Sequence, residues 1–116
     1  MTYDIEIVLR ERNYAVTETV LHGTATGDWT DLDVETVLKS MLLAIDRAKN
    51  PGTDDRYVAL RGFSWIVEPA EGGVVIALEI PSGAAVAGPF HIEQARLDRM
   101  ITRVIAAARP VPPVVH

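Results

Sequence analysis

The stretch PSGAAVAGPF, residues 81–90, holds Gly83 and Gly88 between an apolar run typical of a strand and a helical pattern. This is the context of a phosphate-binding loop, which needs converging backbone N–H groups, a lysine directly after the second glycine and then a hydroxyl. Pro89 stands at the lysine position and Phe90 at the hydroxyl position. The sequence therefore excludes Walker-type nucleotide binding and predicts a connector between a strand and a helix.

A weaker anion site is still compatible with this connector. The first N–H groups of a helix have no partner within the helix and attract anions. Ser82 and His91 flank the predicted start of the second helix and could line such a site. The alternative is that Gly83 and Gly88 only permit tight turns and that Pro89 begins the helix.

Three arginines of the second predicted helix, Arg96, Arg99 and Arg103, form one stripe beside its apolar side. Guanidinium groups in a row can bind a carboxylate or a phosphate through paired hydrogen bonds. A solvated stripe, with Glu93 pairing with Arg96, is the alternative.

Arg61 and Trp65 belong to a strand of mixed chemistry, although a tryptophan is more often part of the core. If the chain binds a small anion, we expect the site to combine Arg61, Trp65, Ser82, Gly83, His91, Arg96, Arg99 and Arg103.

Acidic residues cluster before the first helical pattern, at Asp28, Asp31, Asp33 and Glu35. A calcium-binding EF-hand loop that began at Asp31 would need glycine at its sixth position and glutamate at its twelfth. The chain has Thr36 and Leu42 there. Acids at a helix start are instead expected from capping and from the helix dipole, so we predict no metal site here.

The three histidines, His22, His91 and His116, have no spacing that places two of them on one side of a helix. A general acid–base pair of His22 or His91 with Glu79 stays open, but no catalytic signature accompanies it. We therefore expect no cofactor and lean towards a protein that is not an enzyme.

Composition bounds the remaining classes. The net charge of −5 disfavours general binding to nucleic acid. The acidic start MTYDIEIVL is unlike a signal peptide, and the longest apolar run, Val74–Leu78, is far shorter than a membrane span. The absence of cysteine excludes disulfides and is compatible with a reducing compartment. These features favour a cytoplasmic protein without nucleic-acid or membrane partners.

The first half of the chain predicts a hairpin followed by a helix. Alternating apolar residues over 3–10 and β-branched residues over 14–22 are typical of two strands. Apolar residues at i, i+3, i+4 and i+7 predict a helix over 34–48, with Asp33 as its N-cap. The sequence NPG at 50–52 ends it.

The second half predicts another hairpin and another helix. Two apolar segments, 56–68 and 74–80, are joined by the turn residues PAEGG, and a change in alternation at Gly62 indicates a β-bulge. A second amphipathic helix is expected from about 90 to 108, ended by Pro110.

The predicted order is therefore ββαββα, in one α+β domain over 1–109 with a proline-rich tail over 110–116. Two helices on one face of a four-stranded, largely antiparallel sheet would make a two-layer sandwich. The other face would expose apolar residues that need a cover, namely Val58, Leu60, Val75 and Ala77.

This exposed face leads to the main functional hypothesis, a non-enzymatic protein–protein interaction module that acts as a homodimer. One alternative is a protein or small enzyme that binds a small anion through the 81–91 segment and the arginine stripe. A further alternative is an inhibitor or chaperone of a basic partner, which would use the acidic segment 17–35 and bind less tightly at high salt.

Overall fold

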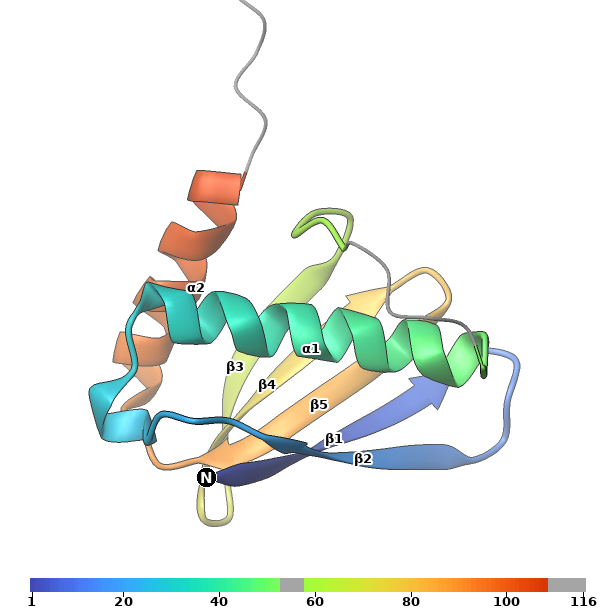
Figure 1. The fold of residues 1–116 in the computed structure, drawn as a ribbon, viewed down its shortest axis with the longest axis horizontal. Helices are drawn as coiled ribbons and strands as arrows, with labels where there is room; N and C mark the ends of the chain where they lie inside the picture. Colours follow the sequence, from blue (N-terminus) through green and yellow to red (C-terminus); the bar gives the residue numbers. More distant parts are fainter. Residues whose placement is uncertain (53–57, 109–116) are drawn as a thin grey trace, which may run out of the picture.

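A five-stranded antiparallel sheet with two helices packed on one of its faces forms the fold of the computed structural model (Figure 1). Residues 1–52 and 58–108 are described. The elements are β1 (Thr2–Leu9), β2 (Ala15–Leu21), the short 3-10 helix η1 (Thr26–Asp28), α1 (Asp31–Lys49), β3 (Ser64–Ala70), β4 (Gly73–Ile80), β5 (Gly83–Phe90) and α2 (Gln94–Ala108). Across the sheet the strands follow the order β2-β1-β5-β4-β3. The predicted α+β class is confirmed, whereas the predicted tail over 110–116 lies outside the described residues.

The predictions of four strands and of ββαββα order are wrong, because the supposed connector forms a fifth strand, β5, in the middle of the sheet. Glycine and alanine are poor strand formers, and this segment shows no contrast between its two sides. Small side chains suit this position in the sheet, because Ala85 and Ala87 are buried and α1 packs against β5. A Cβ at Gly83 would lie only 2.6 Å from the carbonyl oxygen of Val8.

The irregularity of the sheet lies between β4 and β5 and not at Gly62, which precedes β3 and has a φ of 76°. The register shifts between the pairs Ile76–Ala87 and Val74–Phe90. Pro89 lies at this shift, where its missing N–H interrupts the ladder least. The change of alternation in the sequence has another cause, since β3 begins only at Ser64 and the residues before it are loop.

Helix α1 confirms the predicted apolar side but begins earlier than predicted. Its N-cap is Thr30, and Asp33 occupies the third helical position, where its Oδ2 accepts the backbone N–H of Thr30 at 2.8 Å. The predicted capping role of Asp33 is therefore wrong in position, although the residue still stabilises the helix start. The buried residues of α1 are Val34, Val37, Leu38, Met41, Leu42, Ala44 and Ile45.

Helix α2 begins at Gln94 and not near residue 90, because Phe90 ends β5 and is fully buried beside Trp29, at 5.0 Å between ring centroids. α2 packs against α1 and β3. Its buried residues are Leu97, Met100, Ile101 and Val104. Figure 1 shows α1 lying across the strands and α2 standing at the β3 side. The core lies between these helices and the sheet.

Candidate functional site

The predicted anion site at the start of α2 is not formed. Ser82 lies in the turn before β5 and His91 follows its last residue, so the eight-residue strand separates them. At about 3.4 Å per residue, a strand of this length spans well over 20 Å. Gly83 is the first residue of β5 and is packed against β1. Ser82 and His91 would lie together only if residues 83–90 formed a connector and not a strand.

The arginine stripe exists, and two of its three members already have partners within the chain. Arg96 donates to the backbone carbonyl oxygens of Thr26 at 3.4 Å and Trp29 at 2.9 Å, which holds η1 against α2. Arg103 binds both carboxylate oxygens of Asp31, at 3.0 and 2.9 Å. This hydrogen-bonded pair lowers the pKa of the Asp31 carboxyl and raises the pKa of Arg103.

Arg99 joins the other two arginines in lining an open hollow of about 630 Å³ between α1 and α2. Arg61 and Trp65 do not line this hollow. Trp65 is half-buried and packs on the core, opposite Leu78 of β4, while Arg61 is exposed in the loop before β3. The eight residues of the predicted ligand site therefore do not converge.

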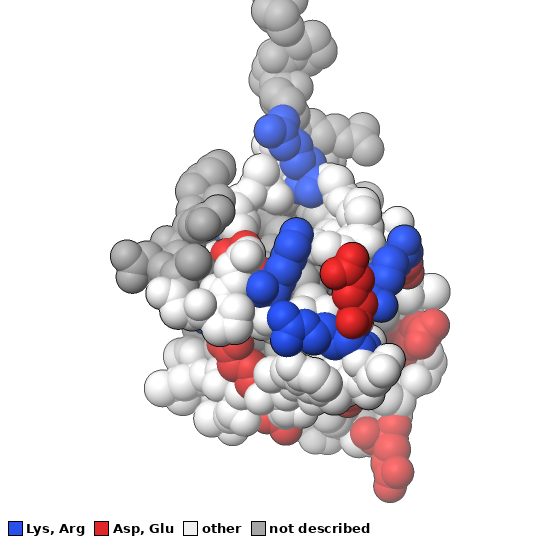
Figure 2. All heavy atoms as spheres, turned by 90° about the vertical axis from the view of Figure 1, so that its right-hand side faces the viewer, with Lys and Arg blue, Asp and Glu red and all other residues white. Residues whose placement is uncertain are grey.

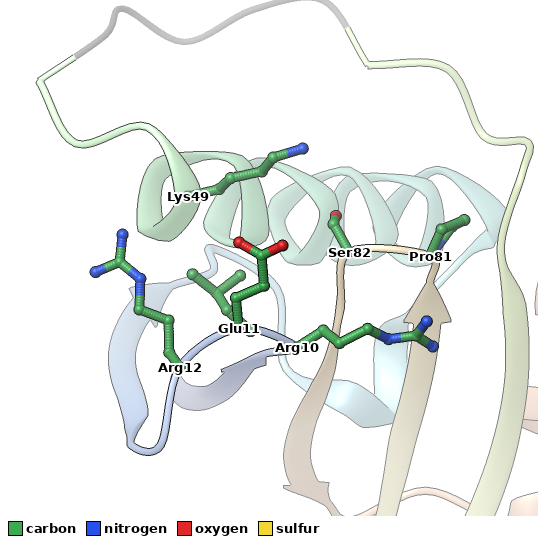
Figure 3. Close-up of a pocket in the computed structure, with 7 residues that line it drawn as sticks. Arg10, Glu11, Arg12, Lys49, Pro81 and Ser82 are labelled. Carbon is green, nitrogen blue, oxygen red and sulfur yellow. The ribbon is translucent and has the colours of Figure 1, made fainter.

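A basic hollow that the sequence analysis missed lies at the other end of the sheet (Figure 3). It has a volume of about 410 Å³ and is lined by Leu9, Arg10, Glu11, Arg12, Lys49, Pro81 and Ser82. Figure 2 shows basic side chains gathered around an acidic one on this end of the molecule. In Figure 3 the carboxylate of Glu11 rises between the basic side chains, and Arg10 and Arg12 point to opposite sides of it.

Three segments build this hollow, and no sequence motif links them. The turn after β1 carries Arg10 and Arg12, the end of α1 carries Lys49, and the β4–β5 turn carries Ser82. The backbone N–H of Arg10 donates to the carbonyl oxygen of Ser82 at 3.0 Å, which ties the two turns together. The Arg12 guanidinium also donates to the Tyr14 hydroxyl at 2.9 Å.

The face of the sheet turned away from the helices is a further candidate surface. Its middle row runs in register across four strands, from Glu6 through Val86 and Ala77 to Ile66. Val86 is 40% and Ile66 51% exposed. We call this surface the open face; its apolar residues are Val8, Ala15, Leu21, Ile66, Val75, Ala77, Ala84 and Val86.

The open face confirms only part of the predicted exposed set. Val75 and Ala77 lie on it, as predicted. Leu60 is buried in the core and Val58 is half-buried against it, because both precede β3 in a loop that packs on the helix side. A shallow hollow of about 280 Å³ also opens at this part of the sheet, and Ile66, Ala77 and Val86 are among its lining residues.

Every charged strand residue of the open face is acidic: Asp4, Glu6, Glu68 and Glu79. Asp4 accepts a hydrogen bond from the Thr19 hydroxyl at 2.7 Å. Within residues 1–52 and 58–108, no salt bridge joins these four carboxylates to a base. The open face is therefore apolar at its centre and negative around it.

The acids of segment 17–35, in contrast, are largely paired within the chain. Glu18 binds Arg47, Asp31 binds Arg103, and Glu35 binds Lys39. This pairing leaves the 17–35 segment with less negative charge to offer a basic partner than the sequence suggested.

Asp33 completes a buried polar contact with His22. The His22 side chain is 9% and the Asp33 side chain 16% exposed, and His22 Nε2 lies 2.9 Å from Asp33 Oδ1. Hydrogen bonds from the Thr30 backbone and from His22 outweigh the effect of burial and lower the pKa of Asp33 to about 2. His22 also packs edge-on against Trp29, with ring centroids 5.5 Å apart. The possible pair of His22 with Glu79 is therefore not formed, because Glu79 belongs to the opposite face of the sheet.

The two edges of the sheet differ. Edge strand β3 contains Pro69 and is contacted by α2, whose Gln94 side chain donates to the Val67 carbonyl oxygen at 2.9 Å. Edge strand β2 pairs with β1 in an unbroken register, from the pair of Ala15 with Val8 to the pair of Leu21 with Thr2. It contains no proline, glycine or lysine. The β2 edge therefore has neither proline nor lysine to block pairing with another strand, and its one charged residue, Glu18, is held by Arg47.

No family model, curated protein or solved structure matches this chain. In the described ranges, no helix is both long and apolar enough for a bilayer, and no group of three acidic or histidine side chains that could hold a metal ion is found there. The function is therefore inferred from the surfaces of the molecule.

Proposed function

We propose that this protein is a homodimeric protein–protein interaction module whose open face receives a basic partner with apolar anchor residues. The observation that carries the proposal is a row of apolar residues, the exposed Val86 and Ile66 with the half-buried Ala77 between them, across the middle of a sheet face that no described helix covers. Contiguous apolar surface of this kind, surrounded by polar residues, is typical of interaction sites.

The charges around this row define the partner. Four carboxylates that form no salt bridge within the described residues favour lysine or arginine on the partner and disfavour acidic partners and nucleic acid. Such rim charges act mainly on the rate of association, which falls as salt rises. The apolar centre supplies the part of the affinity that salt does not weaken.

The same charges argue that the homodimer does not use the open face. If two copies packed face to face, each would bring Asp4, Glu6, Glu68 and Glu79 into an interface without a single strand-borne base. Like charges opposed across an interface cost several kcal/mol. The homodimer and the partner site are then separate surfaces of one protein.

Substitution of Val86 by lysine tests the partner site. Val86→Lys removes an exposed apolar residue from the row and places a positive charge where the partner is expected to carry one. The control is Leu32→Lys, which changes an exposed apolar residue on α1; Leu32 is 70% exposed and Val86 is 40% exposed.

We expect that wild-type protein and Leu32→Lys retain the same basic protein in affinity purification from the native cell, and that Val86→Lys does not. Retention of the same partner by Val86→Lys, or a wild-type monomer at high micromolar concentration without any co-purifying partner, would refute the proposal.

The basic hollow supports a second candidate function, the binding of a small anion. Arg10, Arg12 and Lys49 bring three positive charges to one hollow of an acidic protein, and Ser82 adds a hydroxyl. Glu11 opposes this binding by charge repulsion, which favours a ligand that carries more than one negative charge.

A thermal-shift titration with inorganic phosphate and citrate tests the second candidate, because a ligand that binds only the folded state raises Tm. We expect Arg12→Ala and Lys49→Ala to remove the increase and Arg61→Ala to leave it. No increase with either anion rejects the anion site.

A further inference from the structure

We propose that two copies of the chain join through their β2 edges, antiparallel, into one continuous ten-stranded sheet. This inference rests on the proposed homodimer and adds the surface and the register that would build it. The β2 edge is seven residues long, pairs with β1 alone among the described strands, and is the outermost strand at its side of the sheet (Figure 1). The opposite edge carries Pro69 and the Gln94 contact and is protected.

The sequence of β2 reads the same in both directions over Val16–Val20, as Val-Thr-Glu-Thr-Val. In an antiparallel pair centred on Glu18, Val16 faces Val20 of the second copy, and Thr17 faces its Thr19. Valine pairs and threonine pairs directly opposite each other stabilise antiparallel strands. All seven residues of β2 then find a partner, from Ala15 opposite Leu21 onward.

Other registers fit less well. In a symmetric continuous sheet, helix-side residues of one copy must oppose helix-side residues of the other copy. A register shifted by one residue breaks this match and is excluded. A shift by two residues places Glu18 opposite Val16 or Val20 and shortens the overlap. The centred register therefore has both the longest overlap and the best-matched residues.

Glu18 lies on the helix side, and the centred register brings its carboxylate opposite the same carboxylate of the second copy. Two carboxylates in this position repel each other. Arg47 of α1 already binds both oxygens of Glu18 in each chain, with Nε 3.4 Å from Oε2. Two copies thus bring two arginines to two carboxylates, which neutralises the centre of the interface.

A two-fold axis through this centre runs perpendicular to the sheet, so the helices of both copies stay on one side. The open faces also join side by side and remain uncovered. The dimer doubles the apolar and acidic surface available to a partner and brings two binding sites onto one molecule.

Sedimentation equilibrium over about 5 to 500 µM tests this arrangement, because dimerisation depends on concentration by mass action. The disrupting variant is Thr17→Lys with Thr19→Lys. Within one chain these positions face Glu6 and Asp4 of β1, so the lysines support the monomer fold. Across the dimer they oppose each other as two pairs of like charges.

Ser64→Lys is the matched control, since Ser64 also lies at a sheet edge and faces an acid, Glu79 of β4. We expect the wild type and Ser64→Lys to be dimers and the double-lysine variant to show a dissociation constant raised at least about tenfold. Arg47→Ala should weaken the dimer, and addition of Glu18→Gln should restore it.

The outcomes separate the two proposals. A monomeric wild type overturns the homodimer itself and this inference with it. A dimer that the double-lysine variant leaves intact overturns only the β2 arrangement, because self-association then uses another surface. If the circular dichroism spectrum shows that the double-lysine variant is unfolded, Arg47→Ala with and without Glu18→Gln decides the test instead.

Discussion

The contact among Thr30, His22 and Asp33 predicts a defined loss of stability when the Asp33 carboxylate is removed. Asp33→Ala deletes the acceptor for the Thr30 backbone N–H at the start of α1 and leaves the buried His22 ring without its partner. Loss of a helix cap costs about 1 kcal/mol, within a range of about 0.5–2. Loss of the partner of a buried polar group adds a similar amount.

The pH dependence of the free energy of unfolding is a second test of the same contact. The pKa of Asp33 is about 2 in the folded protein and 3.8 in its ordinary range. At about 1.36 kcal/mol per pKa unit, this difference corresponds to at most about 2.5 kcal/mol. Water still reaches the carboxyl, so we expect about 1–2 kcal/mol. Because the folded-state pKa is the lower one, this stability is present above pH 4 and is lost as the pH falls towards 2.

Urea unfolding of the wild type, Asp33→Ala and Asp33→Asn at pH 7 and at pH 2.5 tests both parts. We expect Asp33→Ala to be less stable than the wild type by about 2 kcal/mol at pH 7 and by clearly less at pH 2.5. Asp33→Asn keeps an acceptor for Thr30 and should lie between the two at pH 7. An unchanged difference between the wild type and Asp33→Ala at the two pH values would refute the electrostatic reasoning.

Two further predictions concern the sheet. The Tyr3 hydroxyl is buried with no partner at hydrogen-bond geometry among the described residues, and burial raises its pKa while the nearby Ser40 hydroxyl opposes the shift. Tyr3→Phe should therefore leave the free energy of unfolding unchanged or raise it by up to about 2 kcal/mol, and a loss of more than about 1 kcal/mol in urea would mean that the hydroxyl has a partner. Gly83→Ala should lower Tm, because the new Cβ meets the Val8 carbonyl oxygen, by an amount that corresponds to about 1–3 kcal/mol. The control Gly23→Ala meets no atom within 4 Å, and equal effects of the two alanines would contradict the packing described for β5.

The elements that the sequence predicts correctly are those with one apolar and one polar side. β1 alternates buried and exposed residues from end to end, and α1 buries one apolar side. The hairpin of β3 and β4 was marked by its Gly-Gly turn. The acid-rich start of α1 offered several capping residues, and local sequence alone did not distinguish Thr30 from Asp33.

β5 was missed because its two sides are alike in the sequence. Ala84, Ala85, Val86 and Ala87 carry no polar alternation, and the flanking glycines resemble loop chemistry. Only the close approach of α1 and of β1 makes small residues the right choice there, and that is a tertiary effect. The misplaced strand also explains the failure of the predicted anion site, since Ser82 and His91 were joined through a loop that does not exist.

Tertiary contacts that the sequence does not show also decide the surface sites. Residue types identified the arginine stripe, but the backbone carbonyls and the carboxylate that engage Arg96 and Arg103 come from residues about seventy positions away. The basic hollow joins three distant segments without a motif. The sequence did favour an uncovered apolar sheet face, and Val75 and Ala77 lie on it.

Disulfide formation by a single cysteine at position 18 tests the central claim, self-association through β2, most directly. The chain has no cysteine of its own, so Glu18→Cys gives one defined thiol. Residues opposed in an antiparallel pair have Cα atoms about 4.5–5.5 Å apart, which suits a disulfide.

In the same register two copies of residue 17 would be about 8 Å apart, beyond the reach of that bond. We predict that mild oxidation converts Glu18→Cys into a covalent dimer and leaves Thr17→Cys monomeric. Efficient cross-linking of Thr17→Cys, or none of Glu18→Cys at a concentration where the wild type is dimeric, would contradict the account.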